Sequence, residues 1–141
     1  MWDNFKNYGD SPENAFETLC NQLFERYLQR KYKKELLKFS VINGAGGDGG
    51  IEAYGELNTG AIVAIQSKWF LTSMQASQVN QVKKSIVAGL GIRPNISEYF
   101  VCIPRNLASK KRGKGGKISQ NTEEDRVNKL VSDIKIGRAH V

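Results

Sequence analysis

The feature that most constrains the fold is a turn between two apolar segments near the middle of the chain. Residues 57–61, Leu-Asn-Thr-Gly-Ala, have the composition of a three-residue β-hairpin loop. Gly60 would take the left-handed backbone conformation that closes such a loop. We therefore expect two antiparallel strands, at about residues 51–56 and 61–68.

Counting back from this turn brings polar residues of the two strands together. Glu52 falls opposite Gln66, and Gln66 shares a face with Lys68 because side chains alternate along a strand. We therefore expect Glu52, Gln66 and Lys68 to converge. Asp48 precedes them in a glycine-rich stretch that can bend it over the same spot. A shift of one residue would reverse the faces, so this expectation depends on the loop length.

A lone Gln-x-Lys at a strand end usually marks only where the strand leaves the core. Here it follows Gly-Gly-Asp-Gly-Gly-Ile-Glu, at residues 46–52. This combination resembles the PD-(D/E)xK nuclease core, in the Mrr-like branch of type IV restriction endonucleases. The resemblance covers about residues 11–104. It implies an α/β, restriction-endonuclease-like core, with a mixed central β-sheet flanked by helices, and the activity of a metal-dependent DNA endonuclease in restriction or anti-phage defence.

The resemblance also implies a set of site residues. Phe-Glu-x-Leu on the first helix matches the family's site glutamate at Glu17, which would otherwise be interpreted as a solvated helix carboxylate. Relatives usually carry Asp where this chain has Glu52, so either Asp48 or Glu52 could be the principal metal ligand. The expected catalytic residues are Glu17, Asp48, Gln66 and Lys68, and the expected metal ligands are Asp48, Glu52, Gln66 and Ser67.

The chemistry of these groups points to a hard divalent cation. Carboxylate and carbonyl oxygens favour Mg²⁺ or Mn²⁺ over zinc. The ligands would be the carboxylates of Asp48 and Glu52, the side-chain carbonyl of Gln66 and the backbone carbonyl of Ser67. Lys68 would orient the attacking water and offset charge on the phosphate.

A net charge of +7 indicates a polyanionic partner, and DNA is the one we expect. Residues 105–117 contain six cations, three glycines and no acid, which is typical of a mobile basic loop. Such a loop either contacts the DNA backbone or serves only solubility. The expected nucleic-acid-binding residues are Lys110, Lys111, Arg112, Lys114, Lys117 and, in a glutamine row on a later helix, Gln78.

Hydrophobic periodicity predicts the remaining elements. An amphipathic helix should begin at Ser11-Pro12 and carry an apolar stripe to Leu28. Thr72 or Ser73 should cap a second helix that runs to about Gly89. We expect further strands at residues 36–43 and 98–103, and a last helix at residues 123–134.

Length and termini suggest one domain at residues 1–135. Residues 136–141 resemble the translation of a sequencing-library adapter, so we expect a non-native tail there and a longer native chain with a C-terminal regulatory region. Cys20 and Cys102 are interpreted as reduced core thiols of a cytoplasmic protein, and no apolar run is long enough to cross a membrane. A homodimer is compatible with the resemblance. The alternative function is a catalytically inactive nucleic-acid-binding or regulatory module of a larger protein.

Overall fold

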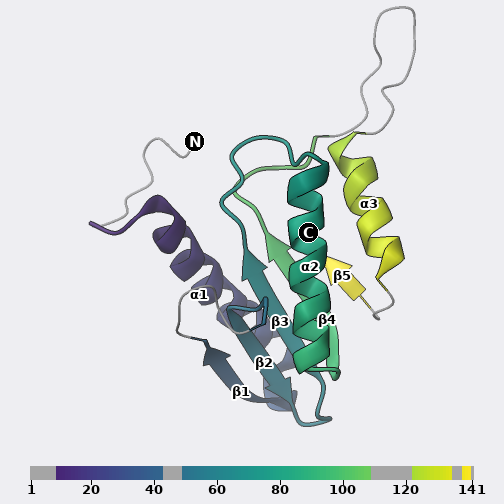
Figure 1. Ribbon diagram of the computed structural model, residues 1–141. Helices are drawn as coiled ribbons and strands as arrows, with labels where there is room; N and C mark the ends of the chain where they lie inside the picture. Colours follow the sequence, from purple (N-terminus) through teal and green to yellow (C-terminus); the bar gives the residue numbers. More distant parts are fainter. Residues whose placement is uncertain (1–8, 43–48, 109–121, 135–137, 141) are drawn as a thin grey trace, which may run out of the picture.

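A computed structural model describes residues 9–42, 49–108, 122–134 and 138–140 (Figure 1). Only the backbone is described for residues 138–140. It is a mixed α/β structure. The elements in chain order are α1 (Pro12–Tyr32), the 3₁₀ turn η2 (Lys33–Glu35), β1 (Leu36–Val41), β2 (Ala53–Leu57), β3 (Ile62–Ser67), α2 (Ala76–Ile92), β4 (Ile96–Cys102), α3 (Glu123–Asp133) and β5 (Arg138–His140).

The strands form one mixed sheet in the order β1-β2-β3-β4-β5. The first three strands are antiparallel neighbours, whereas β4 runs parallel to β3 and β5 runs parallel to β4. The helix α2 makes the crossover between the parallel strands β3 and β4. All six residues of β3 are buried, as expected for a strand with neighbours on both sides and helices on both faces. The expected mixed sheet flanked by helices is confirmed.

Each face of the sheet has its own apolar core, and helices cover both faces (Figure 1). On one face, α1 buries Phe16, Cys20, Phe24 and Leu28 against side chains of β2 and β3. On the other face, α2 and α3 pack over Ile62, Ala64 and Tyr99, among others. Among the described residues, no helix combines the length and apolar character needed to cross a membrane.

The start of α1 is where the sequence predicts it, but the end of α1 and the start of α2 are not. Ser11 caps α1 as expected, its hydroxyl oxygen accepting a hydrogen bond from the Asn14 amide at 3.1 Å. The helix then continues past Leu28 to Tyr32. The expectation that Thr72 or Ser73 caps α2 is wrong. Gln75 is the cap, because its backbone N–H donates to the Gln78 side-chain oxygen at 2.9 Å in a capping box.

The hairpin has the register that its loop predicts. Ala53 pairs with Ile65 and Gly55 with Val63, and the Leu57 amide donates to the Ala61 carbonyl at 2.9 Å. Gly60 has φ +87°, the left-handed conformation expected of it. The hairpin therefore fixes which residues lie opposite each other in β2 and β3.

Both cysteines are free, Cys20 buried and Cys102 half-buried. A hydrogen bond between the two thiols raises the pKa of Cys20 and lowers that of Cys102. The two residues connect α1 to β4 on the face covered by α1.

Candidate active site

A break in strand alternation just before β2 sets the position of Glu52. Ile51 packs in the core beneath α2, whereas Ala53, two residues later, packs in the core beneath α1. Residues two apart in a regular strand would share a face, so the chain is irregular at Glu52. Its amide donates to the Ile65 carbonyl at 2.9 Å, and its carbonyl accepts from the Ile42 amide at 2.7 Å.

This irregularity brings the Glu52 carboxylate to the end of β3. Glu52 Oε2 accepts hydrogen bonds from the Ser67 hydroxyl at 2.6 Å and from the Ser67 amide at 2.9 Å. One residue of β3 therefore fixes the carboxylate through two donors. The sequence predicted Ser67 as a site residue through its backbone carbonyl, and the contact made in the structure uses the other two polar groups of Ser67.

A pocket of about 270 Å³ lies at this end of β3. It collects four of the expected site residues from three parts of the chain: Glu17 from α1, Glu52 from the start of the hairpin, and Ser67 and Lys68 from the end of β3. The aromatic rings of Phe16 and Trp69, whose centroids are 5.2 Å apart, form part of its wall. The lining residues are Glu13, Asn14, Phe16, Glu17, Glu52, Ser67, Lys68, Trp69, Phe70 and Gln81.

Gln66 does not line this pocket, so the expected convergence of Glu52, Gln66 and Lys68 is wrong for Gln66. Alternation along β3 places Gln66 with Ile62 and Ala64, beneath α2. It is buried, and its Oε1 has no hydrogen-bond partner among the described residues. Lys68 reaches the pocket because β3 has ended at Ser67, so strict alternation no longer applies to it.

Asp48 lies outside the described residues. The two glycines that follow it approach α2 closely. A Cβ atom at Gly50 would lie 2.2 Å from the Ser85 carbonyl oxygen, and one at Gly49 would lie 1.9 Å from Ile92 Cδ1. Gly49 and Gly50 are therefore on the same side of the sheet as Gln66.

Burial governs the electrostatics of the pocket. It raises the pKa of Glu17, and it is also the largest effect on Glu52, whose pKa is raised. The hydrogen bonds from Ser67 and the charge of Lys68 oppose this rise at Glu52, while the negative charge of Glu17 adds to it. Two carboxylates that interact in a partly desolvated pocket favour a proton or a cation between them.

The described residues include oxygen donors of the kind that bind divalent cations. Glu17 and Glu52 provide carboxylate oxygens, which suit Mg²⁺ or Mn²⁺, whereas the unpartnered oxygen of Gln66 lies outside the pocket. Among the described residues, no group of three or more His, Cys, Asp or Glu side chains could hold a metal ion. The donor type therefore fits such a cation, and Asp48 is the expected ligand that these residues do not include.

The expected nucleic-acid-binding residues Lys110, Lys111, Arg112, Lys114 and Lys117 lie outside the described residues, and so does most of the expected basic loop. Its first cation, Arg105, has another role, because its guanidinium donates to the buried carboxylate of Glu123. Gln78 belongs to the cap of α2, and its contact with DNA stays a prediction.

Sequence reasoning did not include Trp69, Phe70 and Gln81 among the site residues. In the sequence, Gln81 stands out only as one of three glutamines spaced three residues apart, with Gln75 and Gln78. That spacing does not show which of the three glutamines lines the pocket. The approach of α2 to the end of β3 makes that distinction.

Comparison of the chain with models of known protein families and with curated proteins finds no match.

Proposed function

We propose that this protein is a metal-dependent DNA endonuclease with a restriction-endonuclease-like core of the Mrr-like type, acting in restriction or anti-phage defence. The observation that carries the proposal is the pocket at the end of β3, which contains Glu17, Glu52 and Lys68. Two carboxylates and an ammonium group in one partly buried pocket are the groups that phosphodiester hydrolysis requires. The net charge of +7 supports a polyanionic substrate.

Each group in the pocket has a defined task in this proposal. Glu17 and Glu52, together with Asp48, would hold Mg²⁺ or Mn²⁺, which would supply positive charge to the phosphate and lower the pKa of the attacking water, whereas Gln66 lies outside their pocket. Ser67 holds Glu52 in place through its hydroxyl and amide. Lys68 would orient the attacking water and balance charge that develops on the phosphate.

Nicking of supercoiled plasmid tests the proposal. We expect nicking with Mg²⁺ or Mn²⁺ and none in excess chelator.

Lys68→Met should keep its melting temperature and its DNA retention in a gel shift, yet lose roughly a hundred- to ten-thousand-fold in rate, because general acid–base groups typically contribute that much. Lys84→Met is the matched control, since Lys84 is an exposed lysine of α2 outside the pocket. A Lys68→Met rate within about threefold of the parent rate would remove Lys68 from the mechanism.

Calorimetric titration with Mn²⁺ tests the two acids. If Glu52 and Asp48 are both ligands, Glu52→Gln and Asp48→Asn should weaken Mn²⁺ binding by similar factors. A silent Glu52→Gln change would assign the ligand role to Asp48 alone.

One observation favours the alternative of a nucleic-acid-binding module without catalysis: Gln66 lies outside the pocket that contains Glu52 and Lys68. The same assays separate the two functions. A binding module would retain plasmid in a gel shift and show no metal-dependent nicking at any Mg²⁺ or Mn²⁺ concentration.

A further inference from the structure

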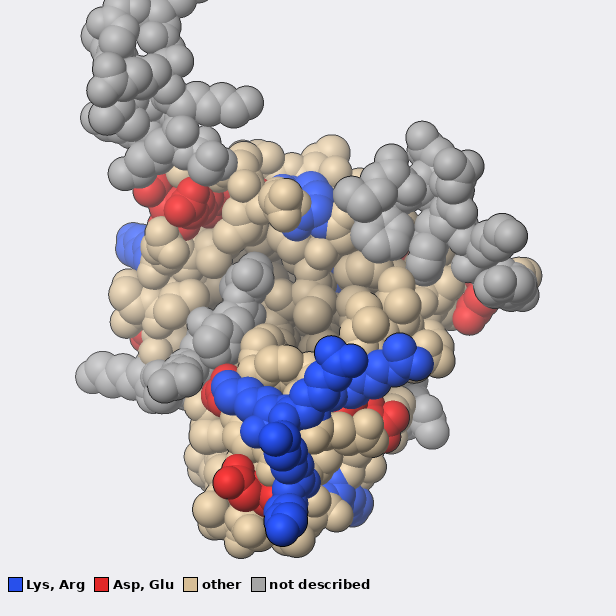
Figure 2. Space-filling view, turned by 180° about the vertical axis from the view of Figure 1, so that it is seen from behind, with Lys and Arg blue, Asp and Glu red and all other residues tan. Residues whose placement is uncertain are grey.

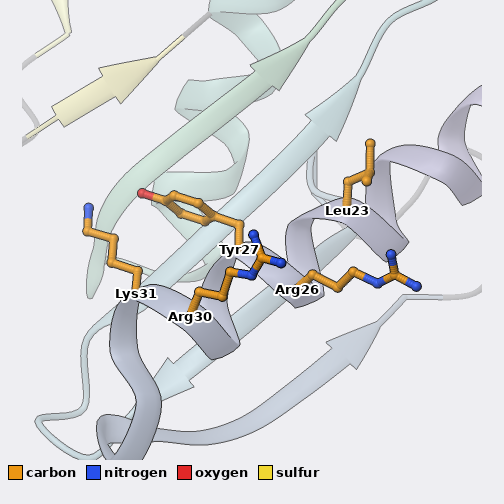
Figure 3. Close-up of a pocket in the computed structure, with 5 residues that line it drawn as sticks. All are labelled: Leu23, Arg26, Tyr27, Arg30 and Lys31. Carbon is orange, nitrogen blue, oxygen red and sulfur yellow. The ribbon is translucent and has the colours of Figure 1, made fainter.

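A second concave surface lies on the C-terminal half of α1, away from the candidate active site. It has a volume of about 470 Å³ and is lined by Leu23, Arg26, Tyr27, Arg30 and Lys31 (Figure 3). We call it the α1 groove. The face that includes α1 shows Lys and Arg side chains gathered in one region (Figure 2). None of the residues that line the groove is acidic.

Two of the three cations of the groove are available to a ligand. Arg26 and Arg30 are exposed, and neither forms an ion pair with another described residue. Lys31 is held in position, because its Nζ lies 3.4 Å from the buried carboxylate of Glu98 and 5.5 Å from the centre of the Tyr27 ring. The groove therefore presents two exposed guanidinium groups beside a fixed ammonium group.

The same groove has an apolar component that solubility does not explain. Leu23 is 53% exposed and Tyr27 is 37% exposed. The Tyr27 ring packs edge-on against Phe100, with ring centroids 5.4 Å apart, so its orientation is fixed by β4. A neighbouring apolar hollow of about 260 Å³ shares Leu23 and Tyr27 with the groove and continues it over Ile65 and Cys102.

We propose that the α1 groove binds single-stranded nucleic acid. Cations that follow a sugar–phosphate backbone, combined with an aromatic ring on which bases stack, are the features of single-strand binding surfaces. Arg26 and Arg30 are four residues apart, about 6 Å along the helix axis, which suits successive phosphates of one strand. Paired bases of a duplex would leave Leu23 and Tyr27 in water, so an unpaired strand uses more of the surface.

The groove lies on the same helix as the candidate active site. Arg26 follows Glu17 by nine residues, or about 14 Å along the axis of α1. Nine residues are two and a half helical turns, so the two residues lie on opposite sides of α1, and a strand in the groove would have to cross the helix to reach the pocket. The inference shares the nucleic-acid partner of the proposed function, but it depends on neither metal binding nor cleavage.

Fluorescence anisotropy with a labelled 20-nucleotide oligo(dT) tests the inference, with the full chain in excess chelator so that no cleavage occurs. The double variant Arg26→Ala/Arg30→Ala should bind at least tenfold more weakly at low salt. The slope of log K against log salt should become shallower by about 0.7 for each phosphate that the protein no longer neutralises. The matched control is Lys84→Ala/Lys129→Ala, which removes two exposed cations from the helices on the opposite face of the sheet. An equal loss of affinity in both double variants, or no loss in either, would overturn the proposal.

The apolar part of the groove has its own test. Tyr27→Leu should lose roughly fivefold or more in oligo(dT) affinity, whereas Tyr27→Phe should bind like the parent, because only the ring stacks on a base. Melting temperatures of both variants check that packing against Phe100 survives. Affinity for a duplex of equal length should change little with Tyr27→Leu. An equal loss for duplex, or full competition by poly-glutamate, would show a general anion surface and reject single-strand binding.

These results are separable from those of the plasmid assay. Lys68→Met should bind oligo(dT) like the parent, since Lys68 is not part of the α1 groove. A protein that binds oligo(dT) through the groove but never nicks plasmid would retain this inference and lose the proposed nuclease activity. A protein that nicks plasmid but does not bind oligo(dT) through the groove would support the nuclease activity and reject single-strand binding by the α1 groove.

Discussion

Glu52 depends on a single neighbour for its position in the pocket. Both hydrogen bonds that its side chain accepts from described residues come from Ser67. Hydrogen bonds to charged groups typically contribute about 1.5–3 kcal/mol, and a carboxylate that loses one becomes freer to rotate. The hydroxyl of Ser67 therefore serves both the stability of the hairpin end and the geometry of the candidate site.

We predict that Ser67→Ala lowers the free energy of unfolding by about 1–3 kcal/mol and slows metal-dependent nicking. The amide of residue 67 would still donate to Glu52, so the loss should be smaller than that of Glu52→Ala. Urea denaturation and the plasmid assay measure the two effects. Ser77→Ala, at an exposed position in the first turn of α2, is the control and should change neither.

Glu123 is a second carboxylate whose surroundings decide its charge. It is buried at the start of α3 and accepts hydrogen bonds from Arg105, from the Met74 amide and, at 2.8 Å, from the Ala108 amide. Burial by itself would raise its pKa, but these donors outweigh burial and lower the pKa to about 2. The ionised carboxylate therefore ties together the chain before α2, the chain after β4, and α3.

The lowered pKa of Glu123 predicts a pH dependence of stability. The stabilisation should be complete above the ordinary pKa of about 4.5 and should be lost as pH falls toward 2, since protonation removes the charge paired with Arg105. Glu123→Gln should cost about 3–5 kcal/mol at pH 7, as breaking one side of a buried ion pair typically does. Denaturation of the parent and the variant at pH 7 and pH 3 should show the difference shrinking. The exposed neighbour variant Glu124→Gln should follow the parent at both pH values.

Single residues of the site were predictable where their chemistry was local. The motif identified Glu17, Glu52, Ser67 and Lys68, which the structure brings to one pocket. It could not place Gln66, because the position of Gln66 relative to Glu52 follows from the sequence only if alternation is regular up to Glu52. The chain is irregular at that residue, and a strand pattern inferred from sequence contains no signal for such a break.

At the level of elements, the glycines before β2 determine how closely the hairpin can approach α2. Gly50 has φ +83°, and a Cβ atom there would lie 2.2 Å from the backbone oxygen of Ser85. Gly91, near the end of the same helix, has no atom within 4 Å of its hypothetical Cβ. Packing against α2 therefore requires a glycine at position 50, whereas it leaves room for a side chain at position 91.

We predict that Gly50→Ala destabilises the protein by at least about 1–3 kcal/mol, from the left-handed backbone and the clash with α2. Gly91→Ala should instead stabilise it by about 0.5–1 kcal/mol, because alanine loses less conformational entropy in a helix. Urea denaturation of both variants is the measurement. Equal effects of the two changes would contradict the close approach at Gly50.

The elements themselves were mostly predictable, because their signals are periodic and local. The hairpin register followed from five loop residues, and the start of α1 followed from Ser11 and Pro12. The start of α2 did not, since its N-cap is Gln75, and glutamine is not among the residues preferred at that position. Thr72 and Ser73 are better caps by composition but lie outside the helix.

For the whole molecule, we predict from the charge of +7 that binding to DNA weakens as the salt concentration rises. Replacing Lys110, Lys111 and Arg112 with Ala should flatten the slope of log K against log salt for duplex DNA by up to about 0.9 for each phosphate that is no longer neutralised. Filter binding over a range of salt concentrations gives this slope. An unchanged slope would show that residues 110–112 do not contact the duplex.

The central position of β3 has a consequence for how a substrate could enter the pocket. This strand is hydrogen-bonded on both sides, to β2 and to β4, and all its residues are buried. Its amides should therefore be among the last to exchange with deuterated water, while those in the exposed first turn of α1 exchange early. The floor of the pocket would then stay fixed through many local openings of the beginning of α1, which forms part of its wall.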